Sequence, residues 1–357
     1  MRKPLQTRLV WLALCMPLVL PASAQDPNPF LAHITPMAEA EDIESGAFAQ
    51  YFERVGRWDF APDVMIADWN GVRFGPDGRF VGLDLGAGVA QYFAPDGRLL
   101  KTLDLTECEP GFAGQLTKAA VFDDGSFLIM PSGGVPGFWF DTSGTCTGRF
   151  DYGRFFPLYA IASLGHRLIT VRRVPPVLEI EERADGDVLK RTITSIDRHP
   201  NLNGIIPGGG LHRTSEGRLY VGMTTGLDYA VFDSTGRSLG AIGETPAFFR
   251  GVTQDAESHA TAFGEYMSRV SKLNSIRVRS FLVGDALVSL AQNGYEPETS
   301  PRRHALHAIR ITGELITSED VYLPRSVVFV GAFDDLLFRL MVPDDGEPFF
   351  AVYRIRG

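Results

Sequence analysis

The sequence lacks three features that would assign a function directly. After residue 20 it has no apolar run of the roughly twenty residues that a bilayer span requires. It has no basic excess, because 34 Lys and Arg against 43 Asp and Glu give a net charge of −9. That balance excludes nonspecific nucleic-acid binding, which needs a basic surface. The sequence also lacks a His-Glu-x-x-His zinc motif, a Gly-x-x-x-x-Gly-Lys-Ser/Thr phosphate loop and an EF-hand, so we expect no bound metal or cofactor.

The first residues form a targeting segment. A basic start at residues 2–8 precedes the apolar stretch Leu9 to Leu20, and Ala22-Ser23-Ala24 provides a small-residue cleavage site. The apolar stretch is too short for a membrane anchor and contains Pro17. We therefore predict that residues 1–24 are a signal peptide, that cleavage falls after Ala24, and that the mature protein is periplasmic or secreted. Cleavage removes three basic residues, so the mature net charge is 31 − 43 = −12.

Cysteine is scarce, and only Cys108 and Cys146 remain after cleavage. An even pair in an oxidising compartment favours a disulfide, with two separate buried thiols as the alternative. The strand pattern described next places the two residues toward opposite edges of their sheets, and a bond requires Cα atoms within about 7 Å. We predict the bond and leave the local strand register open.

A recurring unit runs along the chain, made of four strands with a glycine turn in each of its two hairpins. The first copy is clear: its first hairpin turns at Pro76-Asp77-Gly78 and its second at Pro95-Asp96-Gly97. Asp-Gly between alternating hydrophobic residues indicates a hairpin, because glycine tolerates the positive φ of such turns. Five further copies follow, at about residues 123–144, 164–186, 215–236, 283–313 and 333–355.

Self-similarity at 40 to 50 residues is typical of propellers. We predict an all-β, six-bladed β-propeller with four-stranded antiparallel blades; a seventh, degenerate blade near the N-terminus is the alternative. The last copy lacks its outer strand, and Arg54 to Phe60 is expected to supply it and close the ring, which removes exposed sheet edges.

The turn sequences resemble those of a known superfamily. Phe232-Asp233-Ser234-Thr235-Gly236-Arg237 and Phe93-Ala94-Pro95-Asp96-Gly97-Arg98 are similar to the third turn in the six-bladed propellers of the NHL and TolB-like superfamily. The resemblance covers residues 54 to 357 and implies the fold, but no activity. Propeller lactonases resembling gluconolactonase hold a divalent cation with Glu, Asn and Asp at the channel mouth. Asn70 and Asp228 match two of these ligands, and no acidic residue at an inner-strand start completes the set.

Two segments lie outside the repeat. Residues 25–50 are acidic and proline-containing, and we interpret them as a mobile leader with one short helix that precedes the propeller domain at 51–357. In Thr253 to Asn274, Phe263, Met267 and Val270 recur at helical spacing. We predict an inserted helix at about 253–274, which packs over the propeller rim or, alternatively, binds a partner.

The candidate ligand-binding residues lie where the inner strands of a propeller line its central channel. Several are cations, and a positive potential focused at a channel mouth attracts carboxylates and phosphates. Ion pairing with neighbouring blades is the alternative. Inner-strand candidates are Asn70, Arg73, Lys118, Tyr159, His212, Arg277, Arg279 and Arg325. Arg172, Asp228 and Tyr295 are candidates on loops of the same face, and Tyr295 belongs to the long loop Gln292 to Arg303.

Histidine patterns do not predict a metal site. His304 and His307 are three apart on a strand and therefore point to opposite faces. His212 follows Gly208-Gly209-Gly210, where small residues either admit a ligand or relieve crowding.

Three functions remain open. The first is an exported binding module that recognises a small anionic molecule, a glycan or a peptide at the channel mouth, and we favour it over an enzyme. The second is a metal-dependent hydrolase or lactonase of propeller fold, which would use a divalent cation. The third is a protein-interaction scaffold. The oligomeric state does not follow from the sequence.

Overall fold

A computed structural model gives the structure of the chain. It describes residues 28–36, 43, 46–62, 64, 66, 69–84, 88–112, 116–131, 137–150, 158–164, 167–174, 177–183, 191–196, 210–223, 226–244, 246–250, 275–293, 303–317, 321–324, 327–343 and 346–357. The predicted signal peptide at 1–24, the inserted helix at 253–274, Arg325 and Tyr295 lie outside these residues.

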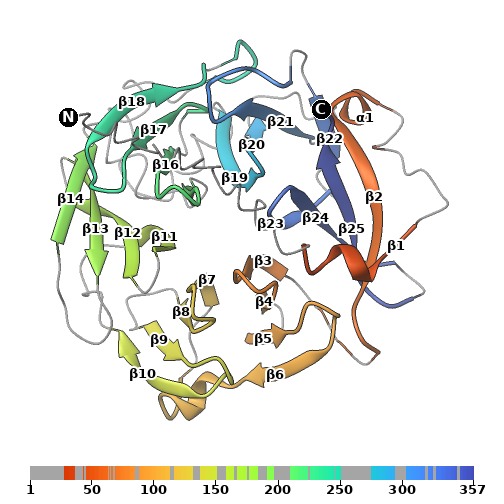
Figure 1. Ribbon diagram of the computed structural model, residues 1–357, viewed down its shortest axis with the longest axis vertical. Coiled ribbons are helices and arrows are strands. Elements are labelled where there is room, and N and C mark those ends of the chain that lie inside the picture. The colour runs from red at the N-terminus through yellow and green to blue at the C-terminus, as the bar shows by residue number, and fades with distance from the viewer. Residues whose placement is uncertain are drawn as a thin grey trace, which may run out of the picture.

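Within this described part, the strands form six antiparallel sheets arranged in a ring (Figure 1). In each of the first five sheets, four strands follow one another in chain order from the centre outward. Sheet 1 contains β3 (Trp69–Phe74), β4 (Phe80–Asp84), β5 (Val89–Phe93) and β6 (Leu99–Leu103). Sheet 2 contains β7 (Leu116–Val121), β8 (Phe127–Pro131), β9 (Gly137–Phe140) and β10 (Cys146–Phe150). Sheet 3 contains β11 (Leu158–Leu164), β12 (Arg167–Val174), β13 (Val177–Arg183) and β14 (Arg191–Ile196).

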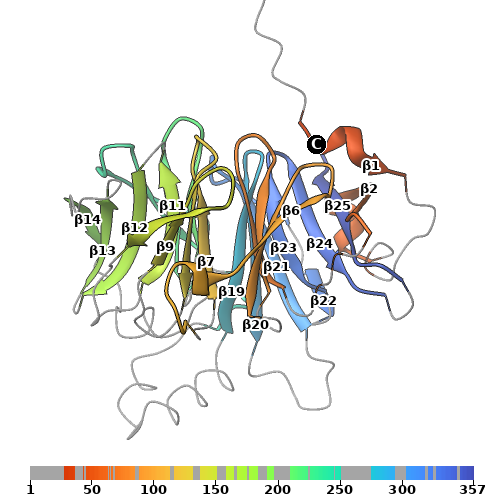
Figure 2. The ribbon, with the colours of Figure 1, turned by 90° about the horizontal axis from the view of Figure 1, so that it is seen from below.

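The remaining sheets complete the ring. Sheet 4 contains β15 (Leu211–Arg213), β16 (Leu219–Gly222), β17 (Tyr229–Phe232) and β18 (Ser238–Ile242). Sheet 5 contains β19 (Ser275–Val283), β20 (Ala286–Asn293), β21 (Arg303–Arg310) and β22 (Val321–Pro324). Sheet 6 contains β23 (Phe329–Phe333), β24 (Leu336–Met341), β25 (Phe349–Ile355), β2 (Phe52–Asp59) and β1 (Ile34–Thr35). The innermost strands contact one another around the ring in the order β3, β7, β11, β15, β19, β23. Figure 2 shows the same sheets from the side, standing next to one another.

The N-terminal strand closes the ring as the sequence predicts. β2 pairs antiparallel with β25 and extends from Phe52 to Asp59, two residues ahead of the expected Arg54 start. β1 then adds a fifth strand to this sheet, which the sequence pattern does not indicate. The first and last parts of the chain are therefore held together by backbone hydrogen bonds.

The predicted hairpin turns are confirmed. Gly78 and Gly97 have φ of 79° and 85°, in the left-handed region that favours glycine. Asp77 and Asp96 each accept a hydrogen bond from the backbone N–H two residues later. A Cβ on Gly97 would also lie 2.4 Å from the carbonyl oxygen of Asp59, so this turn packs directly against β2.

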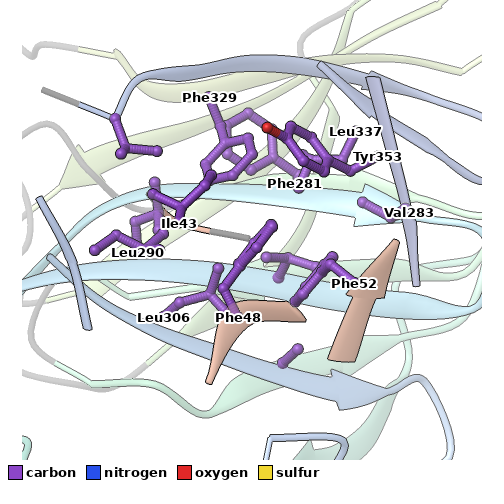
Figure 3. Close-up of a cluster of buried hydrophobic side chains, with 14 of the residues drawn as sticks. Ile43, Phe48, Phe52, Phe281, Val283, Leu290, Leu306, Phe329, Leu337 and Tyr353 are labelled. Carbon is purple, nitrogen blue, oxygen red and sulfur yellow. The ribbon is translucent and has the colours of Figure 1, made fainter. Parts of the chain in front are cut away.

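The segment before β2 differs from the predicted mobile leader, because its described part packs into the propeller. Phe30 is fully buried, with its ring centroid 5.8 Å from that of Trp58. Ile43 and Phe48 join the apolar cluster between sheets 5 and 6 (Figure 3). Phe48 lies on the short helix α1 (Phe48–Tyr51) and stacks on Phe52 at 4.6 Å. The acidic composition suggested solvent exposure, but a few aromatic residues determine the outcome, since each buries a large apolar area.

The predicted disulfide is confirmed. Cys108 and Cys146 are bonded, with their Cα atoms 5.7 Å apart. Cys108 follows the short 3₁₀ helix η3 (Leu105–Glu107) after sheet 1, and Cys146 begins β10 in sheet 2. The strand-order argument placed them at opposite edges because it treated the sheets as flat. Propeller sheets twist, and the end of β6 meets the β9–β10 turn, where Lys101 Nζ donates to Gly144 O at 2.9 Å.

Candidate anion-binding site at the centre of the ring

A repeated β-bulge gives the inner strands a common register. In β3, β7, β11, β19 and β23 the register with the next strand shifts by one residue near the start of the inner strand. The residues just before the bulge are Trp69, Leu116, Leu158, Arg277 and Phe329, and those just after it are Gly71, Lys118, Ala160, Arg279 and Gly331. β15 aligns by its hairpin, which places Gly210 at the position of Gly71.

The position after the bulge therefore forms one layer around the ring. In ring order its residues are Gly, Lys, Ala, Gly, Arg and Gly. Lys118 and Arg279 stand on strands that lie opposite each other in the ring, and four small residues separate them.

Arg73 lies one step further along β3, two residues after the bulge layer. Its side chain is exposed to solvent. Burial and the charge of Arg279 lower the pKa of Arg73. Burial and the charge of Arg73 in turn lower the pKa of Lys118. Arg73 therefore interacts electrostatically with Arg279 on β19 and with Lys118 on β7.

Arg73 and Lys118 form no ion pair with a carboxylate in the described part of the chain. Arg73 donates from Nη1 to the carbonyl oxygen of its neighbour Val72 at 2.9 Å. Arg279 donates from Nη1 to Phe329 O at 2.8 Å, which ties it to β23. The alternative that neighbouring sheets neutralise these cations is thus not what the structure shows for Arg73 and Lys118.

His212 stands opposite Arg73 in the ring, at the equivalent position of β15. Its Nε2 lies 2.8 Å from Ser280 Oγ on β19. Burial, followed by the charges of Arg277 and Arg73, lowers the pKa of His212 to about 3. The imidazole is therefore neutral at neutral pH, and it can donate or accept a hydrogen bond without adding charge.

The surroundings of Gly210 explain why glycine occupies this position of the run before His212. A Cβ at Gly210 would lie 1.9 Å from Ser280 Oγ and 2.5 Å from His212 Nε2. Crowding by two side chains of this protein therefore requires the glycine, rather than a ligand that approaches the backbone. Gly208 and Gly209 lie outside the described residues.

Unlike Arg73, Lys118 and Arg279, Arg277 has no contact with solvent. It precedes the bulge of β19 and is fully buried, where the other described inner strands have large apolar residues. Its Cζ lies 4.2 Å from the ring centroid of Tyr229, and its Nη2 donates to Asp228 O at 3.2 Å. A Cβ on Gly222 would lie 1.9 Å from Nη1, so this glycine makes room for the guanidinium.

For most of the other predicted site residues the structure gives a position along a strand, without side-chain contacts. Asn70 lies on β3 at the bulge, Tyr159 at the bulge of β11, and Arg172 within β12. Asp228 precedes β17 and is partly buried. The sixth inner strand begins at Phe329, four residues after the predicted start at Arg325.

One catalytic pattern in the sequence has the wrong structural context. Gly236-Arg237-Ser238-Leu239-Gly240 matches the Gly-x-Ser-x-Gly elbow of α/β-hydrolases. That elbow is a sharp turn from a strand into a helix, whereas Ser238 is exposed and begins the outer strand β18. The match therefore reflects the propeller turn sequence.

The comparisons with known proteins agree with the fold. A member of the DUF4221 family from Bacteroides vulgatus is 11% identical, with a TM-score of 0.57, over 86% of this chain and 99% of the other. A protein from Bacteroides fragilis named as exported is 8% identical, with a TM-score of 0.61, over 90% of this chain and 98% of the other. No family model and no curated protein matches the sequence.

These findings define the class. The chain is an all-β propeller of four-stranded antiparallel blades with almost no helix in its described residues. At such identities the similarity shows the fold alone. Among the residues described, no helix is long and apolar enough to cross a bilayer, and no three His, Cys, Asp or Glu side chains gather as a metal site would require.

Proposed function

We propose that this protein is an exported, six-bladed binding propeller that holds a small multivalent anion at the centre of its ring. Each of the six sheets counts as one blade. The N-terminal targeting sequence and the exported protein of similar fold support the location. The proposal rests on the electrostatic interaction of Arg73 with both Arg279 and Lys118, and on the lack of a carboxylate partner for Arg73 and Lys118 in the described chain.

Repulsion among the cations favours a bound anion. Three cations that face one space disfavour each other's charge, and their burial adds a desolvation cost; both effects appear as the lowered pKa values of Arg73 and Lys118. A bound anion with two or more negative charges relieves this repulsion. The chain has a net charge of −9, so most of its surface repels anions. A cluster of cations would produce a local positive potential that attracts them.

The geometry favours a multivalent ligand over a single carboxylate. Lys118 and Arg279 lie on opposite strands, and Arg73 interacts electrostatically with both. Arginine binds carboxylate or phosphate through two parallel hydrogen bonds, while lysine acts as a point charge. His212 adds a neutral hydrogen-bonding group on the far side of the ring.

Calorimetric titration with citrate, succinate and inorganic phosphate at constant ionic strength tests the proposal. We expect binding by at least one of these anions and a 10- to 100-fold weaker affinity in Lys118→Met, which corresponds to losing one charged hydrogen bond of about 1.5 to 3 kcal/mol. Arg237→Met is the matched control, because Arg237 is 77% exposed on an outer hairpin and should leave affinity unchanged.

Two results would contradict the assignment. One is unchanged affinity in folded Lys118→Met and Arg73→Met. The other is equal weakening in Arg237→Met, which would mean that the anions respond to net charge and not to the centre of the ring.

A further inference from the structure

The interface between sheets 4 and 5 contains a row of polar side chains that runs outward from the ring centre. It begins with His212, whose Nε2 contacts Ser280 Oγ at 2.8 Å. Ser280 pairs across the strands with Ser289, and Ser289 pairs with His307 on β21. Tyr229 from sheet 4 meets this row, with its Oη 2.7 Å from Ser289 Oγ. We call these five residues, together with Arg277 above Tyr229, the polar seam.

Apolar clusters flank the polar seam on both sides. One contains Tyr220, Val231 and Leu287, and the other contains Leu227, Phe249 and Ala291. Water reaches such a place poorly, so each polar group in it needs a partner inside the protein or a bound species.

Within the polar seam, Arg277 has the most side-chain nitrogens without a hydrogen-bond partner in the described chain. It is 0% exposed, and its Nε and Nη1 have no hydrogen-bond partner within the described chain. No described carboxylate forms an ion pair with it. A buried cation without a counter-charge is costly, because the interior solvates charge far less well than water.

The other unmet groups in the seam are also suited to donate. His307 is 4% exposed and its Nε2 lacks a partner among the described residues. One of the hydroxyls of Tyr229 and Ser289 donates a hydrogen bond to the other. The hydrogen of the accepting hydroxyl therefore has no acceptor among the described residues. A cation, an imidazole nitrogen and a spare hydroxyl hydrogen in one dry interface match an acceptor with negative charge.

We propose that the polar seam binds a single small monovalent anion, a halide such as chloride, beside the Arg277 guanidinium. This site is separate from the centre of the ring. The anion would neutralise Arg277 and accept from the hydroxyl pair, and its role would be to hold sheets 4 and 5 together. A monoatomic ion is favoured over a carboxylate ligand because Gly222, the Tyr229 ring and Asp228 O already cover three sides of the guanidinium.

Diffraction from wild-type crystals grown in sodium bromide tests the site directly. We expect an anomalous bromide peak within hydrogen-bonding distance of the Arg277 guanidinium. A water or a protein carboxylate at that place, with no anomalous signal, would overturn the proposal.

Thermal unfolding provides the solution test. At one fixed ionic strength, exchange of sodium gluconate for sodium chloride should raise the wild-type Tm by about 2 °C, because an ion that binds only the folded state stabilises it. Arg277→Leu should abolish the difference, and it should fold because Leu116 occupies the equivalent buried position in sheet 2.

Two control variants separate this site from other anion effects. Lys118→Met removes a cation at the ring centre and Arg237→Met one at the surface, and both should retain the chloride effect. Its loss in Lys118→Met would assign the effect to the ring centre, and its absence in the wild type would refute the proposal.

Discussion

Two interfaces between neighbouring sheets of the ring differ in chemistry. The interface between sheets 6 and 1 is aromatic, and the interface between sheets 4 and 5 is polar. Between sheets 6 and 1, Trp58, Trp69, Phe80 and Phe350 form a continuous aromatic cluster, with Trp58 and Phe350 stacked at 5.3 Å. Between sheets 4 and 5, the polar seam interrupts the apolar packing. Trp69 and Arg277 occupy equivalent positions before the bulge, so the difference lies in the side chain and not in the backbone.

This contrast shows how a repeated fold divides its tasks. The aromatic interface lies where the N-terminal strand closes the ring, and closure has to hold the two ends of the chain. The polar seam lies away from that junction, between sheets 4 and 5. Variants at the two interfaces should therefore differ in the size of their effect on stability.

The largest effect is expected from Trp69→Ala. Trp69 is 2% exposed and packs against Phe60, Phe93 and Phe350 at centroid distances of 5.3 to 5.8 Å. Its truncation leaves a cavity and should lower the free energy of unfolding by about 3 to 5 kcal/mol, measured by urea denaturation. Leu239→Ala, at a 47% exposed site, should change it by less than about 0.5 kcal/mol. A loss below about 1 kcal/mol for Trp69→Ala would remove the contrast.

The disulfide between sheets 1 and 2 should rank second. Cys108 and Cys146 are 38 residues apart, and a bond that closes such a loop stabilises by about 2 to 4 kcal/mol by restricting the unfolded chain. The double variant Cys108→Ser, Cys146→Ser should lose that amount in urea denaturation. Wild type in reducing agent should lose a similar amount, and a large discrepancy between the two would indicate that the serines perturb packing.

The pH dependence of stability should report on the polar seam. Burial, followed by the charge of Arg277, lowers the pKa of His307 to about 4, and that of His212 is lowered to about 3. Both histidines ionise near pH 6.5 when unfolded. Between pH 6.5 and 4.5 the unfolded state therefore binds more protons, and stability should fall as pH falls, by up to about 1.4 kcal/mol per pH unit for each histidine.

The variant His307→Asn should have a shallower slope than the wild type in that pH range, by up to about 1.4 kcal/mol per pH unit, measured by denaturant unfolding at several pH values. Above pH 7.5 the two proteins should respond to pH alike, since both histidines are then neutral in either state. An unchanged slope in the variant would show that His307 is not held neutral by its surroundings.

The smallest effect is expected from Tyr229→Phe. The change removes the hydroxyl that pairs with Ser289 Oγ and should cost about 1 kcal/mol, because it leaves a buried oxygen without its partner. The double variant Tyr229→Phe, Ser289→Ala should recover part of the loss. If the losses of Tyr229→Phe and Ser289→Ala, measured separately, simply add in the double variant, the two hydroxyls do not stabilise each other. That result would contradict the hydrogen bond that we assign to the polar seam.

Prediction from sequence worked best where the information is local. The Asp-Gly turns identify the hairpins because an Asp side chain and a left-handed glycine define the turn by themselves, as at Asp77 and Gly78. The missing outer strand of the last copy correctly pointed to the segment now seen as β2. Arg73, Lys118 and Arg279 are predicted as inner-strand cations, and they lie on the inner strands β3, β7 and β19.

Prediction failed where a single residue alters the register or where distant segments meet. The bulge in β19 separates Arg277 from Arg279 in environment, although they are two residues apart and would otherwise share a face. The N-terminal leader looked mobile because its composition is acidic, yet Phe30 and Phe48 find aromatic partners far along the chain. The two cysteines seemed too far apart because sheet twist is invisible in a strand order.

The sequence by itself determined the hairpins, the repeat and the closing strand, since turn chemistry and alternation act over a few residues. Only the tertiary structure decided that Arg277 is buried between sheets while Arg73 stays exposed to solvent. The reason is physical: a repeat specifies each blade locally, whereas charge repulsion, burial and unmet hydrogen bonds arise between blades. Arg277 and Lys118 look alike in the sequence, but the contacts across blades bury Arg277 fully and leave Lys118 partly exposed.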